Sequence, residues 1–161
     1  MMKNETPCEN GDIIDFDDQD LRIINILTPN QKNKLEDLPF VSEETLRVYY
    51  RYLEEKLPHQ LELTGRESTG YFSWEEAFEF GYGNDEQYNK LKKIKASYQD
   101  KYQFQALLNS DCKDGIITHV MRIGDQKIFD VPLSDLEVVD VNLDAWQIIE
   151  DYSMWIVNFN D

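Results

Sequence analysis

The segment Lys101–Leu133 reads KYQFQALLNSDCKDGIITHVMRIGDQKIFDVPL, and its pattern decides the fold of the chain. In its first third, apolar residues occupy every second position, which is typical of a half-buried strand. These residues are Tyr102, Phe104, Ala106 and Leu108. Two turn signals, NSDCKDG and GDQ, separate this stretch from the apolar runs IITHVMRI and KIFDVPL. We therefore predict three consecutive antiparallel strands joined by tight turns.

Two further strands extend this meander. Pro132 ends the third strand, and a short turn, LSDL, then leads into a last strand, EVVD. Upstream, HQLELTG places Leu61 and Leu63 at alternate positions and is another short strand candidate. The pattern predicts a small bent antiparallel sheet or an SH3-like barrel.

Two amphipathic helices are expected to flank the sheet. For the first, at 43–57, Ser42 can cap the N-terminus and Pro58 ends the helix. Its apolar residues recur at three- and four-residue steps. For the second, at 143–157, Asp140 or Asn142 can act as the cap. The fold class that follows is α+β, with these two helices packed on the sheet or barrel.

The length of 161 residues suits one domain. We expect a flexible tail at 1–12 and a single α+β domain at 13–161, with a helical insertion at about 65–100. Ser73 and Glu76 form a capping-box pattern in this insertion, and a second helix there carries the basic run KLKKIK, interpreted as a solvated face. The pattern of residues 13–28 does not decide between helix and strand.

Charge restricts the classes of partner. There are 32 Asp and Glu against 16 Lys and Arg, a net charge of -16. A field of this sign repels phosphates and anionic lipids, so we expect neither nucleic-acid nor membrane binding. Cys8 and Cys112 form no disulfide or zinc pattern, and no apolar leader is present. We therefore predict a cytoplasmic protein.

Catalytic signals are weak. His59 and His119 lie in no triad-like motif, and Cys112 falls in an expected hairpin turn. The glycines of GYGND are not followed by a phosphate-binding lysine at the required spacing. We predict that the chain is not an enzyme.

Carboxylates are the groups in excess, and calcium takes six to eight oxygen ligands. The run DFDDQD superficially resembles a calcium loop, but no glycine stands at its sixth position and Ile26 occupies the twelfth, so it is not an EF-hand. SDCKDG likewise places Lys113 where a ligand would be needed. A site must therefore combine acids from several segments, unless those acids are simply exposed to solvent.

The best candidates lie on the two flanking helices. Glu54 and Glu55 close the first helix, where the helix dipole disfavours negative charge, and Glu150 and Asp151 lie midway along the second. Adjacent acids on a helix diverge by about 100°, so at most one of each pair can face a given partner.

Two blocks around these acids, VYYRYLEEKL at 48–57 and KIFDVPLSDLEVVDVNLDAWQIIEDYSMWIV at 127–157, carry a family resemblance. They resemble the cyanobacterial-type calcium-binding protein family, whose members are small, acidic and lack an EF-hand. The resembling residues are Tyr52, Leu53, Glu54 and Glu55, then Val131, Pro132, Leu133, Ser134, Leu136 and Glu137, and finally Ile149, Glu150, Asp151, Tyr152 and Trp155.

The resemblance implies a compact protein that binds calcium as a buffer or sensor. It carries over Glu54 and Glu55, together with Glu150 and Asp151. We add three acids because they lie near the matched blocks in sequence: Glu62, Asp135 and Asp140. These seven residues are the predicted calcium ligands.

An alternative hypothesis is an acidic protein-interaction module of the immunity or inhibitor type, which would bind a basic protein partner. Exposed aromatic residues in the insertion would then anchor the interface, namely Tyr71, Trp74 and Tyr82.

Overall fold

The computed structural model describes residues 16–29 and 37–160, so the tail expected at 1–12 lies outside the described residues. Five antiparallel strands form one sheet in the order β5-β4-β3-β2-β6. The strands are β2 (Glu62–Gly65), β3 (Lys101–Asp111), β4 (Gly115–Arg122), β5 (Ile128–Pro132) and β6 (Leu136–Val138). The predicted α+β class, meander and bent sheet are confirmed.

The sheet is open, so the barrel alternative is wrong. After β5 the chain passes through the short helix η3 (Leu133–Asp135), and β6 then pairs with β2 at the opposite edge. In the described part of the chain, β5 pairs with β4 and β6 pairs with β2, and these two edge strands do not pair with each other. Curvature comes instead from two register shifts in β3, between Phe104 and Ala106 and between Leu107 and Asn109.

The β3–β4 turn packs closely on the last helix, α6 (Asp144–Asn158). Gly115 has φ +74°, and a Cβ at this position would lie 2.5 Å from the hydroxyl oxygen of Tyr152. That oxygen accepts a hydrogen bond from the backbone N–H of Ile116 at 2.8 Å. Glycine at the turn therefore allows the sheet and α6 to be joined directly.

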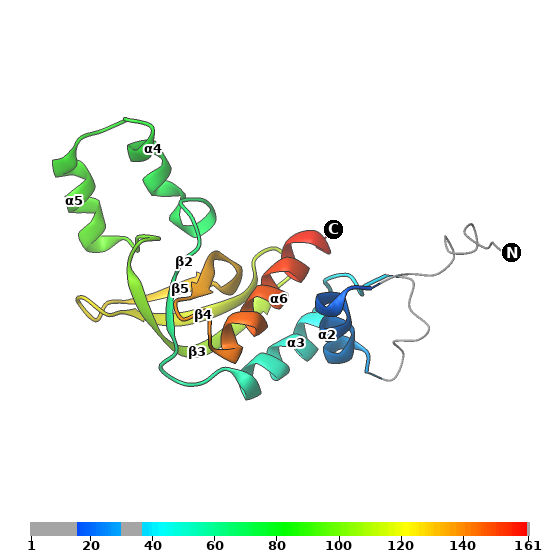
Figure 1. Cartoon of the computed structure of the whole chain (residues 1–161). Helices are drawn as coiled ribbons and strands as arrows, with labels where there is room; N and C mark the ends of the chain where they lie inside the picture. The colour runs from blue at the N-terminus through cyan, green and yellow to red at the C-terminus, as the bar shows by residue number, and fades with distance from the viewer. Residues whose placement is uncertain (1–15, 30–36, 161) are drawn as a thin grey trace, which may run out of the picture.

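Three helices lie together beside the sheet (Figure 1). α3 (Glu43–Lys56) contacts β3, α6 contacts β6, and α2 (Asp18–Leu27) contacts both α3 and α6. The two predicted flanking helices are confirmed. The helical assignment of α2 resolves the segment that the sequence pattern left open, and Asp17 caps it by accepting from the N–H of Asp20.

Of the two flanking helices, α3 has the expected capping residue and α6 does not. Ser42 caps α3, as predicted, and the structure adds a reciprocal capping box with Thr45. By contrast, α6 starts after Leu143 with no side-chain cap, and Asp140 accepts from the N–H of Asn142 in the preceding turn. The expected capping by Asp140 or Asn142 is therefore wrong, because this turn has its own hydrogen bond and ends before the helix begins.

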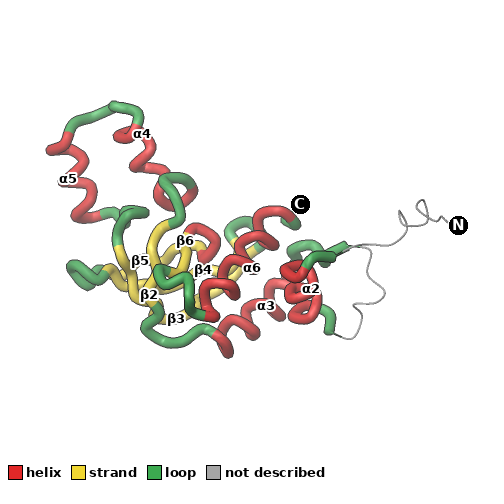
Figure 2. Tube along the Cα trace, in the orientation of Figure 1, coloured by secondary structure: helices red, strands yellow, loops and turns green. Residues whose placement is uncertain are grey.

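The segment between β2 and β3 contains η2 (Gly70–Glu75), α4 (Glu76–Glu79) and α5 (Asp85–Ile94). In Figures 1 and 2 it extends away from one end of the sheet. Its anchor is Glu75, whose side chain is buried. The carboxylate accepts hydrogen bonds from Tyr88, Ser97 and the backbone N–H of Tyr98, all at 2.7 or 2.8 Å. Helices in this segment were expected, but Ser73 lies inside η2 and caps nothing.

Candidate metal centre

One cavity places two carboxylates beside other oxygen donors. It has a volume of about 250 Å³ and lies between the β3–β4 turn, η3 and the end of α6. Among the lining residues, Asp114 and Asp135 have carboxylates, Ser134 a hydroxyl and Asn160 an amide, and one cation, Lys113, also lines the cavity. The amide nitrogen of Asn160 donates to the carbonyl of Cys112 at 2.8 Å, which leaves its oxygen available. All of these donors are hard oxygens, the ligand type that calcium prefers.

The electrostatics of Asp135 favour a cation. Burial raises the pKa of the Asp135 carboxyl, and the negative charges of Asp114 and Glu67 raise it further. A hydrogen bond from the backbone N–H of Tyr71, at 3.1 Å, and the charge of Arg66 act in the opposite direction. Negative charge at Asp135 is thus only partly compensated by the protein, and a bound cation would complete the compensation.

Gly70 makes room for this carboxylate. Its φ is +59°, and a Cβ there would lie 2.6 Å from one carboxylate oxygen of Asp135 and 2.8 Å from the other. Any larger residue would push the carboxylate aside. The glycine therefore allows the Asp135 carboxylate to lie against η2, where it accepts the hydrogen bond from the N–H of Tyr71.

Arg66 holds two further acids close to the same region. Its guanidinium donates to Glu150 at 3.0 Å and to the backbone carbonyl of Leu136 at 2.9 Å. Glu137 lies 3.8 Å from the same guanidinium. The backbone N–H of Arg66 also donates to the carbonyl of Asp135 at 2.9 Å. Of the predicted ligands, Glu150 and Asp135 are therefore brought near one arginine.

Asp151 has a separate partner. It is buried, and its carboxylate accepts from Arg22 at 2.7 and 2.9 Å and from Gln19 at 3.0 Å. Glu150 and Asp151 thus diverge, as their adjacency on a helix predicts: one pairs with Arg66 and the other with α2.

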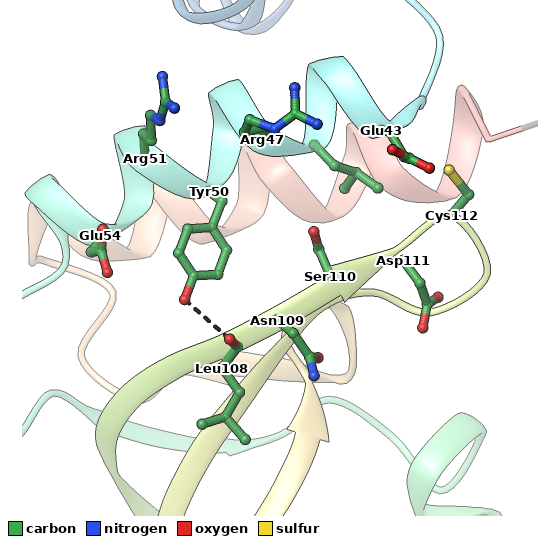
Figure 3. A pocket seen from close by; sticks show the side chains of 11 residues that line it. Glu43, Arg47, Tyr50, Arg51, Glu54, Leu108, Asn109, Ser110, Asp111 and Cys112 are labelled. Carbon is green, nitrogen blue, oxygen red and sulfur yellow. Dashed lines mark hydrogen bonds between the residues drawn. The ribbon is translucent and has the colours of Figure 1, made fainter.

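Glu54 lines a different cavity of about 610 Å³ between α3 and the end of β3, shown in Figure 3. Glu43 and Asp111 also line it, but so do Arg47 and Arg51. The hydroxyl of Tyr50 donates to the carbonyl of Leu107 at 2.9 Å and spans this gap. The cavity containing Asp135 is also lined by a cation, Lys113, so lining charge does not separate the two cavities. The Asp135 cavity differs in holding a half-buried carboxylate whose pKa is raised by burial.

The remaining predicted ligands, Glu55, Glu62 and Asp140, are exposed on α3, on β2 and in the turn before α6. Across residues 16–29 and 37–160, no three His, Cys, Asp or Glu side chains lie close enough together to hold a metal ion between them. The seven predicted acids therefore do not form one cluster, and their role as ligands stays a prediction.

The aromatic residues proposed as interface anchors have different environments. Tyr71 is 39% exposed and Tyr82 is 69% exposed. Trp74 instead stacks on Tyr88, with 5.6 Å between the ring centres, and its indole N–H donates to the carbonyl of Ala96 at 2.8 Å. Trp74 therefore has a structural role within the insertion.

The family model described as calcium binding, of the CcbP type, matches residues 75–156, just over half of the chain. The chain belongs to the CcbP calcium-binding family. This confirms the resemblance drawn from the sequence. No curated protein sequence matches the chain significantly.

Two solved structures share the fold of this CcbP-family chain. A calcium-binding protein described in its calcium-binding form is 18% identical, with a TM-score of 0.54 over 91% of this chain and 99% of that one. Anabaena CcbP is also 18% identical, with a TM-score of 0.52 over 89% and 94% of the two chains. At this identity the likeness concerns the fold.

The CcbP-family match covers part of both acidic cavities, including residues 108–112 of the one lined by Glu54. Residues 75–156 include Asp114, Ser134 and Asp135, together with Glu150 and Asp151. Glu54, Glu55 and Glu62 precede the matched region.

Sequence reasoning missed two parts of this candidate centre. Asp114 was passed over because its neighbour Lys113 is unsuited to bind a metal, although the glycine after Asp114 does mark a tight turn. Arg66 had no local signal at all, because it meets Glu150 across 84 residues of sequence.

Proposed function

We propose that the chain is a calcium buffer or sensor that binds the ion in the cavity between Asp114 and Asp135. The observation that carries this proposal is the half-buried Asp135, which lines the same cavity as a second acid, Asp114, whose charge raises the pKa of Asp135. Family membership supplies the identity of the ion.

The side chains available here supply fewer oxygens than the six to eight that calcium takes. Asp114, Asp135, Ser134 and Asn160 account for part of the set. Backbone carbonyls and water would complete it, as is usual for calcium sites outside tight binding loops. The predicted affinity is correspondingly moderate.

The cellular location is a separate proposal. We propose that the protein acts in the cytoplasm, as its cysteine content suggests. Among the described residues no helix has the length and apolar character needed to span a bilayer. A basic protein partner and the absence of catalysis stay predictions, and no contact in the described residues favours the interaction-module hypothesis over calcium binding.

Calcium titration by calorimetry, in chelator-treated protein at physiological ionic strength, tests the site. The chain should bind calcium, and Asp135→Asn should reduce the affinity at least about tenfold because one ligand charge is lost. Glu55→Gln is the matched control, since it removes one exposed carboxylate on α3. Loss of binding in Glu55→Gln, with Asp135→Asn unaffected, would place the ion at α3 and overturn the proposed location.

A further inference from the structure

Arg66 lies beside two acids of the matched region, Glu137 and Glu150. Its guanidinium contacts Glu150 on α6 at 3.0 Å through one nitrogen and at 2.8 Å through another. It lies 3.8 Å from Glu137 on β6 and donates to the hydroxyl of Ser153 at 3.2 Å. Arg66 directly follows β2, and its positive charge therefore joins β6 and α6 at the end of that strand.

This charge is only partly exposed and has a fixed position. The side chain of Arg66 is 26% exposed and that of Glu150 is 25% exposed. The hydrogen bond from the backbone of Arg66 to the carbonyl of Asp135 fixes the spacing between the arginine and η3. Partly buried charges interact more strongly than exposed ones and are screened less by salt.

Arg66 has opposite effects on the calcium-free and the calcium-bound protein. Without calcium, Arg66 neutralises Glu137 and Glu150 and so limits the mutual repulsion of the nearby acids. With calcium, the same positive charge repels the incoming ion.

We infer that Arg66 is a built-in counter-cation that stabilises the calcium-free fold and lowers calcium affinity at Asp135. This inference rests on the proposed calcium site. Arg66 is a positioning residue in this account, because it contacts neighbouring acids and acts on the ion through charge.

Substitution of Arg66 separates this role from simple structural support. Arg66→Gln should bind calcium about tenfold more tightly than the unchanged chain, because a repelling charge beside the site is removed. Its melting temperature in chelator should fall, and calcium should raise that temperature more than in the unchanged chain. Arg66→Lys keeps the charge and should restore the lower affinity.

Lys127→Gln is the control for net charge. It removes one exposed positive charge in the β4–β5 connection, at the end of β4 opposite to the β3–β4 turn. Its calcium affinity should stay within about twofold of the unchanged chain, since distant exposed charges are screened.

The experiment is calorimetric calcium titration and thermal melting of the full chain and these variants, alongside Asp135→Asn. Tighter binding in Arg66→Gln, reversed in Arg66→Lys, supports the inference. Equal or weaker binding in Arg66→Gln overturns it, as does an Arg66→Gln chain that stays unfolded even in calcium. If the unchanged chain binds calcium but Asp135→Asn binds it equally well, the proposed site fails instead. Absence of calcium binding in every chain overturns both.

Discussion

The carboxylate of Asp151 on α6 accepts two hydrogen bonds from the guanidinium of Arg22 on α2, at 2.7 and 2.9 Å. The side chain of Asp151 is 6% exposed, whereas that of Arg22 is 37% exposed. This ion pair attaches α2 to the helix that carries much of the core, in a chain whose net charge is strongly negative.

Arg22→Ala should therefore destabilise the fold by about 3 kcal/mol, because it leaves a buried carboxylate without its charged partner. Urea unfolding at neutral pH measures this loss. The double variant with Asp151→Asn should recover part of it, since the unpaired charge is removed. Calcium affinity should not change in Asp151→Asn if the residue is structural; a large loss would support its predicted role as a ligand.

Gly70→Ala should weaken calcium binding, because the added methyl group would lie 2.6 Å from a carboxylate oxygen of Asp135. Gly81→Ala is a matched control: Gly81 also has a positive φ, of +92°, but a Cβ there meets no atom within 4 Å. Both variants should lose about 1 kcal/mol of stability from backbone strain. Only Gly70→Ala should lose calcium affinity in a titration, and equal affinities for the two variants would argue against the position assigned to the ion.

The raised pKa of Asp135 predicts a pH dependence. Burial raises this pKa in the folded state above its unfolded value, so ionisation of Asp135 costs folding free energy. The cost is fully present above the folded pKa and disappears as pH falls below the unfolded value. In chelator, Asp135→Asn should therefore be more stable than the unchanged chain at neutral pH, and the difference should shrink toward about pH 4.

Calcium binding has the corresponding dependence, because a proton on Asp135 competes with the ion. Affinity should start to fall at a higher pH than the ordinary aspartate pKa of 3.8 would require. Titrations from about pH 7 down to about pH 4 measure this. An affinity that is constant over this interval would show that Asp135 does not control binding.

Local patterns account for the parts of the fold that were predicted. The alternation in Lys101–Leu133 and the apolar face of Glu43–Lys56 are properties of neighbouring residues, and both elements form as expected. The pairing of β6 with β2 joins residues such as Val138 and Leu63, which are far apart in sequence. No periodicity reports such a pairing, so the choice between open sheet and barrel could not be made from the sequence.

In the candidate site, too, local features could be predicted from the sequence and contacts between distant residues could not. Acidic composition and the two resembling blocks predict calcium, and Asp135 was among the acids named. The partners of the acids were not predictable, since Arg22 and Arg66 meet Asp151 and Glu150 across 129 and 84 residues. Charge excess alone does not distinguish a carboxylate paired with arginine from one available to an ion.

A crystal structure of the chain grown in calcium, compared with one grown in chelator, tests the central claim most directly. The account predicts a calcium ion in contact with the carboxylates of Asp114 and Asp135, with Asn160 or Ser134 also among its ligands. An ion bound instead at Glu54 and Glu55, or a cavity between Asp114 and Asp135 that holds no ion at saturating calcium, would contradict it.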